Sequence, residues 1–272
     1  SILAPLFKNN NFECLEIKRC EFGRDDISSL SSAMSAVNSS RMKLILGSVC
    51  IKRGGFDAWS SFLQNPNSKL AVLDLGEDDI DDEGANALAR GLSRNSTLQE
   101  LYLSGNDEIT EAGWRAIFTA LQNNPSCRLE KLSLNGNDSI NDTAALSLSQ
   151  ALTINIHIKN LDLVNCHRIT IAGWRSLFQC LQMPNCALEE LDLRGTYLCH
   201  ESVNSLSNVL SNNSRLRELD LSYNSDVNSE DAGWEVLSAV LQSPHSALEK
   251  IDLQENSLND DTAIALANSL ET

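Results

Sequence analysis

The feature that most constrains this chain is an apolar pair, Leu-x-Leu, that recurs along its whole length. The pairs begin at Leu15, Leu44, Leu73, Leu101, Leu132, Leu161, Leu191, Leu219 and Ile251. Their spacing of 28 to 32 residues leaves no room for a linker between repeats. A period of 20–50 residues is typical of solenoids, in which each repeat buries its apolar face against the next. We therefore expect one domain of nine repeats over residues 1–272.

Within each repeat the spacing of the apolar residues changes once, from that of a strand to that of a helix. The Leu-x-Leu step has period two, which favours a short strand, and the apolar residues that follow have helical spacing. Five residues after the first leucine stands a column of mostly small side chains, which are Cys20, Val49, Asp78, Asn106, Asn137, Cys166, Thr196, Asn224 and Asn256. Asn or Cys at this point predicts a buried turn whose backbone groups are satisfied by the side chains.

The repeats also alternate between two types. One type places an aromatic residue early in its helix, namely Phe56, Trp114, Trp174 or Trp234. The other type has a smaller residue in that position, for which the alignment gives Ile27, Ala85, Ala145, Val203 and Ala263. Alternation of large and small side chains allows neighbouring helices to interdigitate without voids. We expect the tryptophans to be core residues rather than a ligand platform.

Segments such as 125–132, 184–191 and 82–92 resemble the ribonuclease-inhibitor-like leucine-rich repeats. This group includes ribonuclease inhibitor, the sensor ends of NOD-like receptors and the Ran GTPase-activating protein. The resemblance implies an α/β solenoid, a horseshoe with parallel strands on the concave face and helices on the convex face, built from nine repeats of two types. It also implies protein recognition, but it identifies no partner, because the shared motif residues belong to the scaffold.

Charge and composition exclude several kinds of partner. The net charge is -16, so nucleic acid and anionic membranes would be repelled, and a basic protein surface is the expected partner. No apolar run approaches the ~18 residues of a membrane span. The eight cysteines form no C-x-x-C pair, which favours reduced thiols in a cytosolic or nuclear protein, and we expect a cytoplasmic location.

The two ends of the sequence show no polar capping repeat. The start, 1–7, lacks the layout of a signal peptide, although a signal could have been lost with a missing part. We therefore expect a fragment of a longer protein, whose terminal apolar residues are partly exposed, covered by another domain or subunit, or buried in a self-contact. These residues are Leu3, Leu6, Phe7, Ile264, Leu266 and Leu270.

Side chains alternate across a strand, so the residue between the two apolar positions is expected on the open concave face. From the sixth repeat onward we predict an acidic stripe, consisting of Asp162, Asp192, Asp220 and Asp252 with Glu190 and Glu218 beside them. A basic partner would relieve their mutual repulsion. The alternative is that Leu-Asp-Leu is only a common scaffold strand. The full set of predicted partner-binding residues adds Asp74, Glu100, Tyr102, Arg194 and Tyr223.

Catalytic and metal motifs are not found in the sequence. Residues 79–84 begin like a calcium loop, but the twelfth position holds Arg90 where a Glu is required, so helix N-terminal capping is the simpler explanation. The four histidines lie in different repeats, and phosphate-loop and hydrolase motifs are absent. We expect no enzyme, cofactor or metal site. The alternatives that stay open are the sensing or autoinhibitory end of a signalling protein and a GTPase activator of the Ran type.

Overall fold

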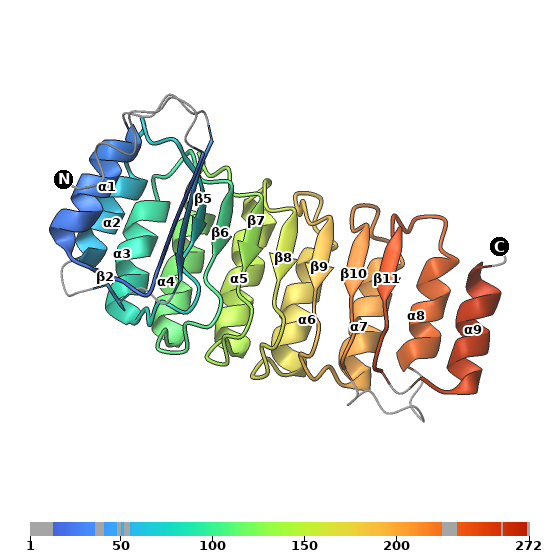
Figure 1. Cartoon of the computed structure of the whole chain (residues 1–272). Coiled ribbons are helices and arrows are strands. Elements are labelled where there is room, and N and C mark those ends of the chain that lie inside the picture. Colours follow the sequence, from blue (N-terminus) through green and yellow to red (C-terminus); the bar gives the residue numbers. More distant parts are fainter. Residues whose placement is uncertain are drawn as a thin grey trace. The chain divides into compact units, whose positions relative to one another are not determined.

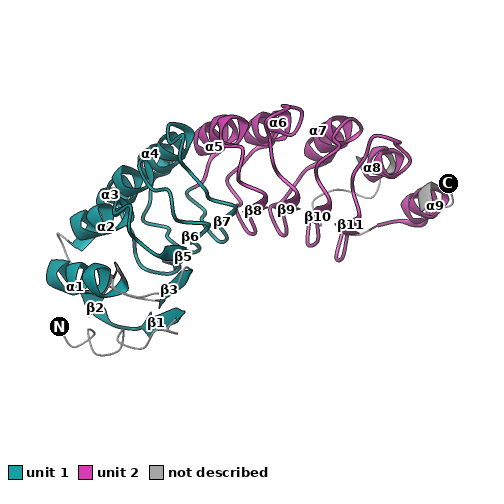
Figure 2. Ribbon diagram, turned by 90° about the horizontal axis from the view of Figure 1, so that it is seen from above, with its two compact units in different colours: residues 1–139 teal, residues 140–272 magenta. Residues whose placement is uncertain are grey.

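Each repeat folds as a short strand, a turn and a helix (Figure 1). The computed structural model of the chain describes residues 13–35, 41–47, 50–51, 55–224, 233–256 and 258–270. The chain divides into two compact units, residues 1–139 and residues 140–272 (Figure 2). In each unit the strands lie along one edge and the helices along the other (Figure 2). The expected α/β leucine-rich-repeat solenoid is confirmed in this layering.

In unit 1 a parallel sheet is built from five strands in the order β1-β3-β5-β6-β7, with β2 and β4 forming a separate parallel pair. The strands of this unit are β1 (Cys14–Lys18), β2 (Glu21–Phe22), β3 (Met42–Gly47), β4 (Cys50–Ile51), β5 (Leu70–Asp74), β6 (Glu100–Tyr102) and β7 (Lys131–Ser133). The helices are α1 (Arg24–Ser35), α2 (Gly55–Leu63), α3 (Asp82–Leu92) and α4 (Glu111–Gln122).

In unit 2 the parallel strands β8 to β11 follow one another in chain order. They are β8 (Asn160–Asp162), β9 (Glu190–Asp192), β10 (Glu218–Asp220) and β11 (Lys250–Asp252). The helices are α5 (Asp142–Ile154), α6 (Ile171–Cys180), α7 (His200–Leu210), α8 (Gly233–Leu241) and α9 (Asp260–Leu270).

The tryptophans are core residues, as the alternation of repeat types predicts. Trp114 and Trp174 are 0% and 1% exposed, and each stacks on a phenylalanine one turn later in its helix. The smaller residues of the alternate repeats are buried from Ile27 to Val203. Ala263 is exposed, contrary to the expectation of a buried column, because among the described helices only α8 packs against α9.

The predicted buried turn forms a ladder of amide side chains in each unit. In unit 1 Asn106 donates to the carbonyls of Leu75 and Leu103, 2.9 and 3.1 Å away. In unit 2 Asn224 donates in the same way to Leu193 and Leu221, at 2.9 Å each. Each asparagine thus joins the loops of two successive repeats and satisfies carbonyls that would otherwise be stranded. Cys20 departs from the column because it is exposed, and Val49 lies outside the described residues.

Of the apolar residues near the two ends of the sequence, those near residue 264 are described by the structure. The side chain of Ile264 is 57% exposed and that of Leu266 is half-buried. Leu3, Leu6 and Phe7 lie outside the described residues, as does the side chain of Leu270.

Candidate functional site

The parallel register of unit 2 aligns the carboxylates of the acidic stripe. Asp162 pairs with Asp192, Asp192 with Asp220, and Asp220 with Asp252. A second column, beside the first, runs from Asn160 through Glu190 and Glu218 to Lys250. Neighbouring strands are about 4.8 Å apart, so successive carboxylates of a column are close enough to repel one another.

The aspartates of the stripe also have a local structural role that the repeat pattern did not reveal. One carboxylate oxygen of each accepts a hydrogen bond from the backbone N–H two residues later, at 2.9–3.1 Å. The donors are the backbone amides of Val164, Arg194, Ser222 and Gln254. Such turns close a strand end with a short polar side chain. The Leu-Asp-Leu strand is therefore partly scaffold, and only the charge beyond this hydrogen bond needs another explanation.

Arg194 lies within the stripe and partly neutralises it. Its Nη2 is 2.8 Å from Asp192 Oδ2, and its Nε is 3.8 Å from Asp220 Oδ2. The second cation of the stripe, Lys250, is 3.0 Å from Glu218. Both ion pairs are substantially exposed and so contribute little stability. Six carboxylates against two cations leave the stripe negative.

Electrostatics at the centre of the stripe disfavour the charged form of Asp192. Partial burial raises the pKa of this carboxyl, and the negative charge of Asp220 raises it further, although Arg194 opposes both effects. A cation placed beside Asp192 by a partner would stabilise the ionised carboxylate. Positive charge beside this carboxyl, such as that of Arg194, therefore favours its ionised form.

The predicted site residues of unit 1 form a separate group. Tyr102 donates its hydroxyl hydrogen bond to Glu100 over 2.8 Å, and Arg41 contacts the other oxygen of Glu100 at 2.6 Å. Lys131 lies over the Tyr102 ring, 5.4 Å from its centroid. Burial and the neighbouring Glu100 raise the pKa of Tyr102, which keeps the phenol protonated. Asp74 accepts a hydrogen bond from the N–H of Gly76 at 3.0 Å. This is the same bond to the amide two residues later that the aspartates of unit 2 accept.

Two exposed tyrosines stand in the loops that follow β9 and β10. Tyr223, which was predicted as a partner-binding residue, is 49% exposed and has a positive φ of 58°. Tyr197 was not predicted; it is 55% exposed, has a φ of 54° and stacks on His167 with ring centroids 4.5 Å apart. A non-glycine residue in this left-handed region is strained by about 1–3 kcal/mol. The exposure of Tyr197 could have been predicted from the sequence. It directly follows Thr196, which belongs to the column of turn residues five positions after the first leucine of each repeat.

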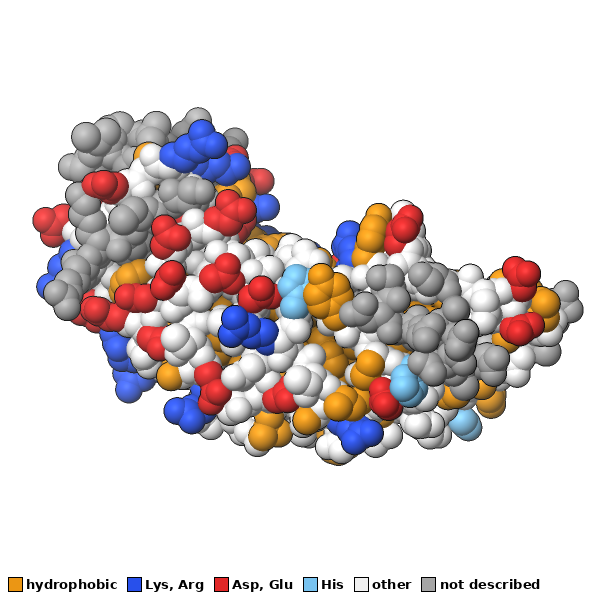
Figure 3. Space-filling model, turned by 90° about the horizontal axis from the view of Figure 1, so that it is seen from below, with side chains coloured by type: hydrophobic (Ala, Val, Ile, Leu, Met, Phe, Trp, Pro, Cys, Tyr) orange, Lys and Arg blue, Asp and Glu red, His pale blue; other side chains and the backbone are white. Residues whose placement is uncertain are grey.

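The acidic segment 77–83 is used for capping and for joining repeats. Asp81 caps α3 by accepting the Gly84 N–H at 2.9 Å. Asp82 accepts two hydrogen bonds from Thr110 of the next repeat, at 2.8 and 2.6 Å. Asp142 holds Thr170 in the same way in unit 2. Figure 3 shows acidic side chains gathered over the strand-to-helix loops of unit 1. The equivalent Asp231 lies outside the described residues.

The described part of the chain holds neither a metal-binding cluster nor a membrane-spanning helix. No three His, Cys, Asp or Glu side chains there gather closely enough to hold a metal ion. None of the helices in those ranges is both long enough and apolar enough to cross a bilayer.

These strands, asparagine ladders and alternating helices define a leucine-rich-repeat solenoid protein, and the comparisons agree. A leucine-rich-repeat family model matches residues 94–118. The chain is similar to pig ribonuclease inhibitor, with 31% identity over 243 residues that cover 89% of this chain and 52% of the relative. It is also similar to mouse NACHT, LRR and PYD domains-containing protein 14, with 29% identity over 91% of this chain and 24% of the relative. The chain thus spans about half the length of these relatives or less.

A solved structure gives the same fold. The leucine-rich-repeat-containing protein LegL7 from Legionella pneumophila matches with a TM-score of 0.50 and 20% identity, over 90% of this chain and 76% of that one. The chain therefore has the leucine-rich-repeat fold, and its repeats are similar in sequence to those of ribonuclease inhibitor.

Proposed function

We propose that this chain is a non-catalytic module that binds a basic protein on the acidic stripe of unit 2. The observation that carries the proposal is the register of the strands, which stacks Asp162, Asp192, Asp220 and Asp252 in one column. Burial raises the pKa of Asp192, and the neighbouring Asp220 of the column adds to this effect. Exposed charges contribute little binding energy each, so the exposed aromatic residues Tyr223 and Tyr197 would supply much of the affinity.

The relatives support a protein-binding role in the cytoplasm. Ribonuclease inhibitor is named for its action on another protein, and its similarity extends over nearly all of this chain. The free cysteines of the described residues suit a reducing compartment. A second candidate is the sensing or autoinhibitory end of a signalling protein, favoured by the similarity to about a quarter of a NACHT-containing protein. The two candidates differ in what adjoins the repeats, and both use their surface for protein contacts.

The test is to replace Asp192 and Asp220 together by Asn and to measure association with a partner captured from the source cell. Asn keeps the oxygen that accepts the N–H of residue 194 or 222, so the turns are retained while two charges are removed. We expect the association rate to fall roughly 3–10-fold at low salt and the difference to fade near physiological salt, where screening acts over about 8 Å.

The matched control removes the same charge from outside the stripe. Glu83 in the first turn of α3 and Glu108 in the loop before α4 are both exposed, and their replacement by Gln changes the net charge equally. This control should leave the association rate almost unchanged. Equal rates for the Asn variant and the wild type at both salt concentrations would show that the stripe is scaffold only.

A further inference from the structure

Two buried thiols meet at the end of α6, although they are not adjacent in sequence. The Sγ atoms of Cys180 and Cys186 are 3.9 Å apart, and each side chain is 2% exposed. Cys180 occupies the last turn of α6, and Cys186 closes the turn that leads toward β9. A disulfide requires a sulfur separation of about 2.05 Å, so side-chain rotation must bring the atoms about 2 Å closer.

The pairing is specific to this repeat. The corresponding turn after α2, α4, α6 and α8 is marked by the same backbone hydrogen bond, donated by Ser68, Cys127, Cys186 and Ser246. The helix residue that precedes the last leucine is Phe62, Ala120, Cys180 and Val240 in these four repeats. Only the α6 repeat has sulfur at both positions. The other three repeats show which residues each position tolerates.

We propose that Cys180 and Cys186 form a reversible redox site that is oxidised to a disulfide by peroxides. The Cys186 thiolate attacks one peroxide oxygen and breaks the O–O bond, which gives a sulfenic acid and an alcohol or water. The Cys180 sulfur then attacks the sulfenic sulfur, loses its proton and expels water. Two thiols and one peroxide thus give one disulfide, one alcohol or water molecule, and one water molecule. Cellular thiols can reduce the bond again.

The surroundings assign different roles to the two sulfurs. The side-chain hydrogen bond between the two sulfurs is the largest cause of the lowered pKa of Cys186. The backbone N–H of Leu188 and the positive charge of Arg215 lower it further. Arg215 is fixed over the turn by a 3.2 Å hydrogen bond to the Pro184 carbonyl. The pKa of Cys180 is raised by the same hydrogen bond and by burial. Cys186 is therefore the attacking thiolate and Cys180 the resolving thiol.

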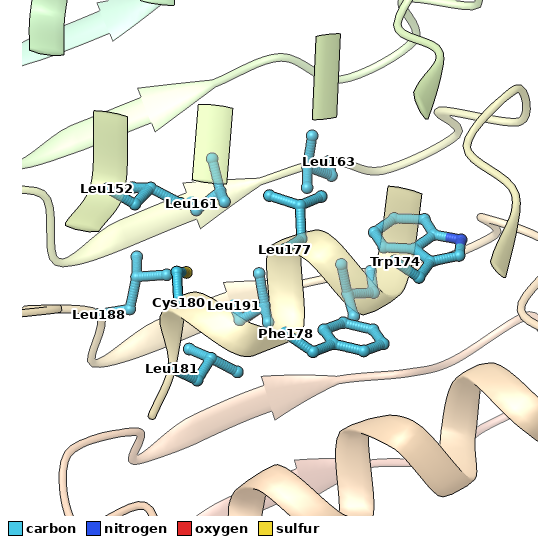
Figure 4. Close-up of a pocket in the computed structure, with 11 residues that line it drawn as sticks. Leu152, Leu161, Leu163, Trp174, Leu177, Phe178, Cys180, Leu181, Leu188 and Leu191 are labelled. Carbon is cyan, nitrogen blue, oxygen red and sulfur yellow. The ribbon is translucent and has the colours of Figure 1, made fainter. Parts of the chain in front are cut away.

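Access to the pair requires only a small local opening. The covering turn consists of residues 182–185, all exposed, including Met183 at 41%. On the inner side Cys180 borders a small apolar cavity between α6 and the strands, together with Leu152 and Leu188 (Figure 4). A short exposed turn opens at a fraction of the global unfolding free energy, and a peroxide is hardly larger than water.

The test treats the folded full-length chain with hydrogen peroxide, then denatures it, alkylates the remaining thiols and digests it with trypsin. The peptide 176–194 contains both cysteines and no others. We expect this peptide to lose both alkylation sites together, to become lighter by two hydrogen atoms, and to recover both sites after reduction. Cys127 should stay alkylated, because its neighbouring helix position holds Ala120.

Two variants separate the steps, and both copy residues found in sister repeats. In Cys180→Ala the sulfenic acid of Cys186 should accumulate and be trapped by dimedone. In Cys186→Ser the loss of alkylatable Cys180 should be at least ~10-fold slower than in the wild type. Circular dichroism checks that both variants remain folded. The proposal is overturned if both thiols stay alkylatable at a dose that oxidises Met183, if Cys186 becomes a sulfinic acid beside a free Cys180, or if the bridge forms only after denaturation.

Discussion

The buried indoles show how much a single residue depends on its neighbouring loop. The Trp114 Nε1–H donates to Ser139 Oγ at 2.9 Å, whereas the Trp174 Nε1 is buried with no hydrogen-bond acceptor among the residues that the structure describes. The loop beside Trp174 is one residue shorter, since Thr196 and Leu198 enclose one residue where Asn137 and Ile140 enclose two. The shorter loop has no equivalent of Ser139.

This difference predicts unequal effects of the same substitution. Trp174→Ala or Trp114→Ala should each cost about 3–5 kcal/mol of unfolding free energy. Trp114→Phe loses a hydrogen bond to the partly buried Ser139 hydroxyl, whereas Trp174→Phe removes a donor that was already unsatisfied. We expect Trp174→Phe to cost about 1 kcal/mol less than Trp114→Phe in urea denaturation. Equal costs would mean that the orphaned indole has an acceptor in solution.

At the scale of the elements, the first turns of α4 and α6, which carry the Ala-Gly-Trp motif, pack closely against the preceding repeat. A Cβ at Gly173 would lie 2.5 Å from Asp142 Oδ1 and 2.7 Å from Ile169 Cγ2. The same geometry is found at Gly113, which faces Asp82. The Ala-Gly-Trp motif therefore needs glycine for close packing, because Asp142 and Asp82 must approach the next helix to hold Thr170 and Thr110.

Helix propensity and packing predict opposite signs for Gly173→Ala. Alanine is the better helix former by about 1 kcal/mol, but the added methyl group should overpack the contact and destabilise the chain by about 1–3 kcal/mol. The adjacent Ala172 is exposed, so Ala172→Gly should show the ordinary propensity cost of about 1 kcal/mol. Denaturant titration of both variants checks this. A stabilised Gly173→Ala variant would contradict the packing argument.

At the scale of the whole molecule, the net charge of -16 is the dominant electrostatic feature. Mutual repulsion among carboxylates destabilises the folded chain, and salt screens it. We expect the Tm to rise by about 2–4 °C between low and physiological ionic strength, which corresponds to about 1 kcal/mol for a chain of this size. Replacement of Glu83 and Glu108 by Gln should reduce this rise. A Tm that falls with salt would show that the exposed ion pairs outweigh the repulsion.

Much of the architecture could be predicted because it depends on periodicity. The spacing of the leucines determines the strands, the polar column identifies the buried turns, and the two repeat types place Trp114 and Trp174 in the core. The acidic stripe could be predicted in the same way. In a parallel solenoid the equivalent residues of successive repeats lie side by side, so the residue type at one position of each strand determines the column. Asp192 and Asp220 could therefore be assigned to one column before the fold was known.

Only the tertiary structure decided which side chains meet across repeats. The contact of Arg194 with Asp192 and Asp220, the stack of Tyr197 on His167 and the pairing of Cys180 with Cys186 depend on loop lengths and rotamers. The cysteine pair could not be predicted, because sequence spacing does not show where a helix ends and a turn folds back. Periodicity specifies the backbone, since every repeat must bury the same face, whereas chemistry depends on distances between side chains, which the backbone path and its irregular turns determine.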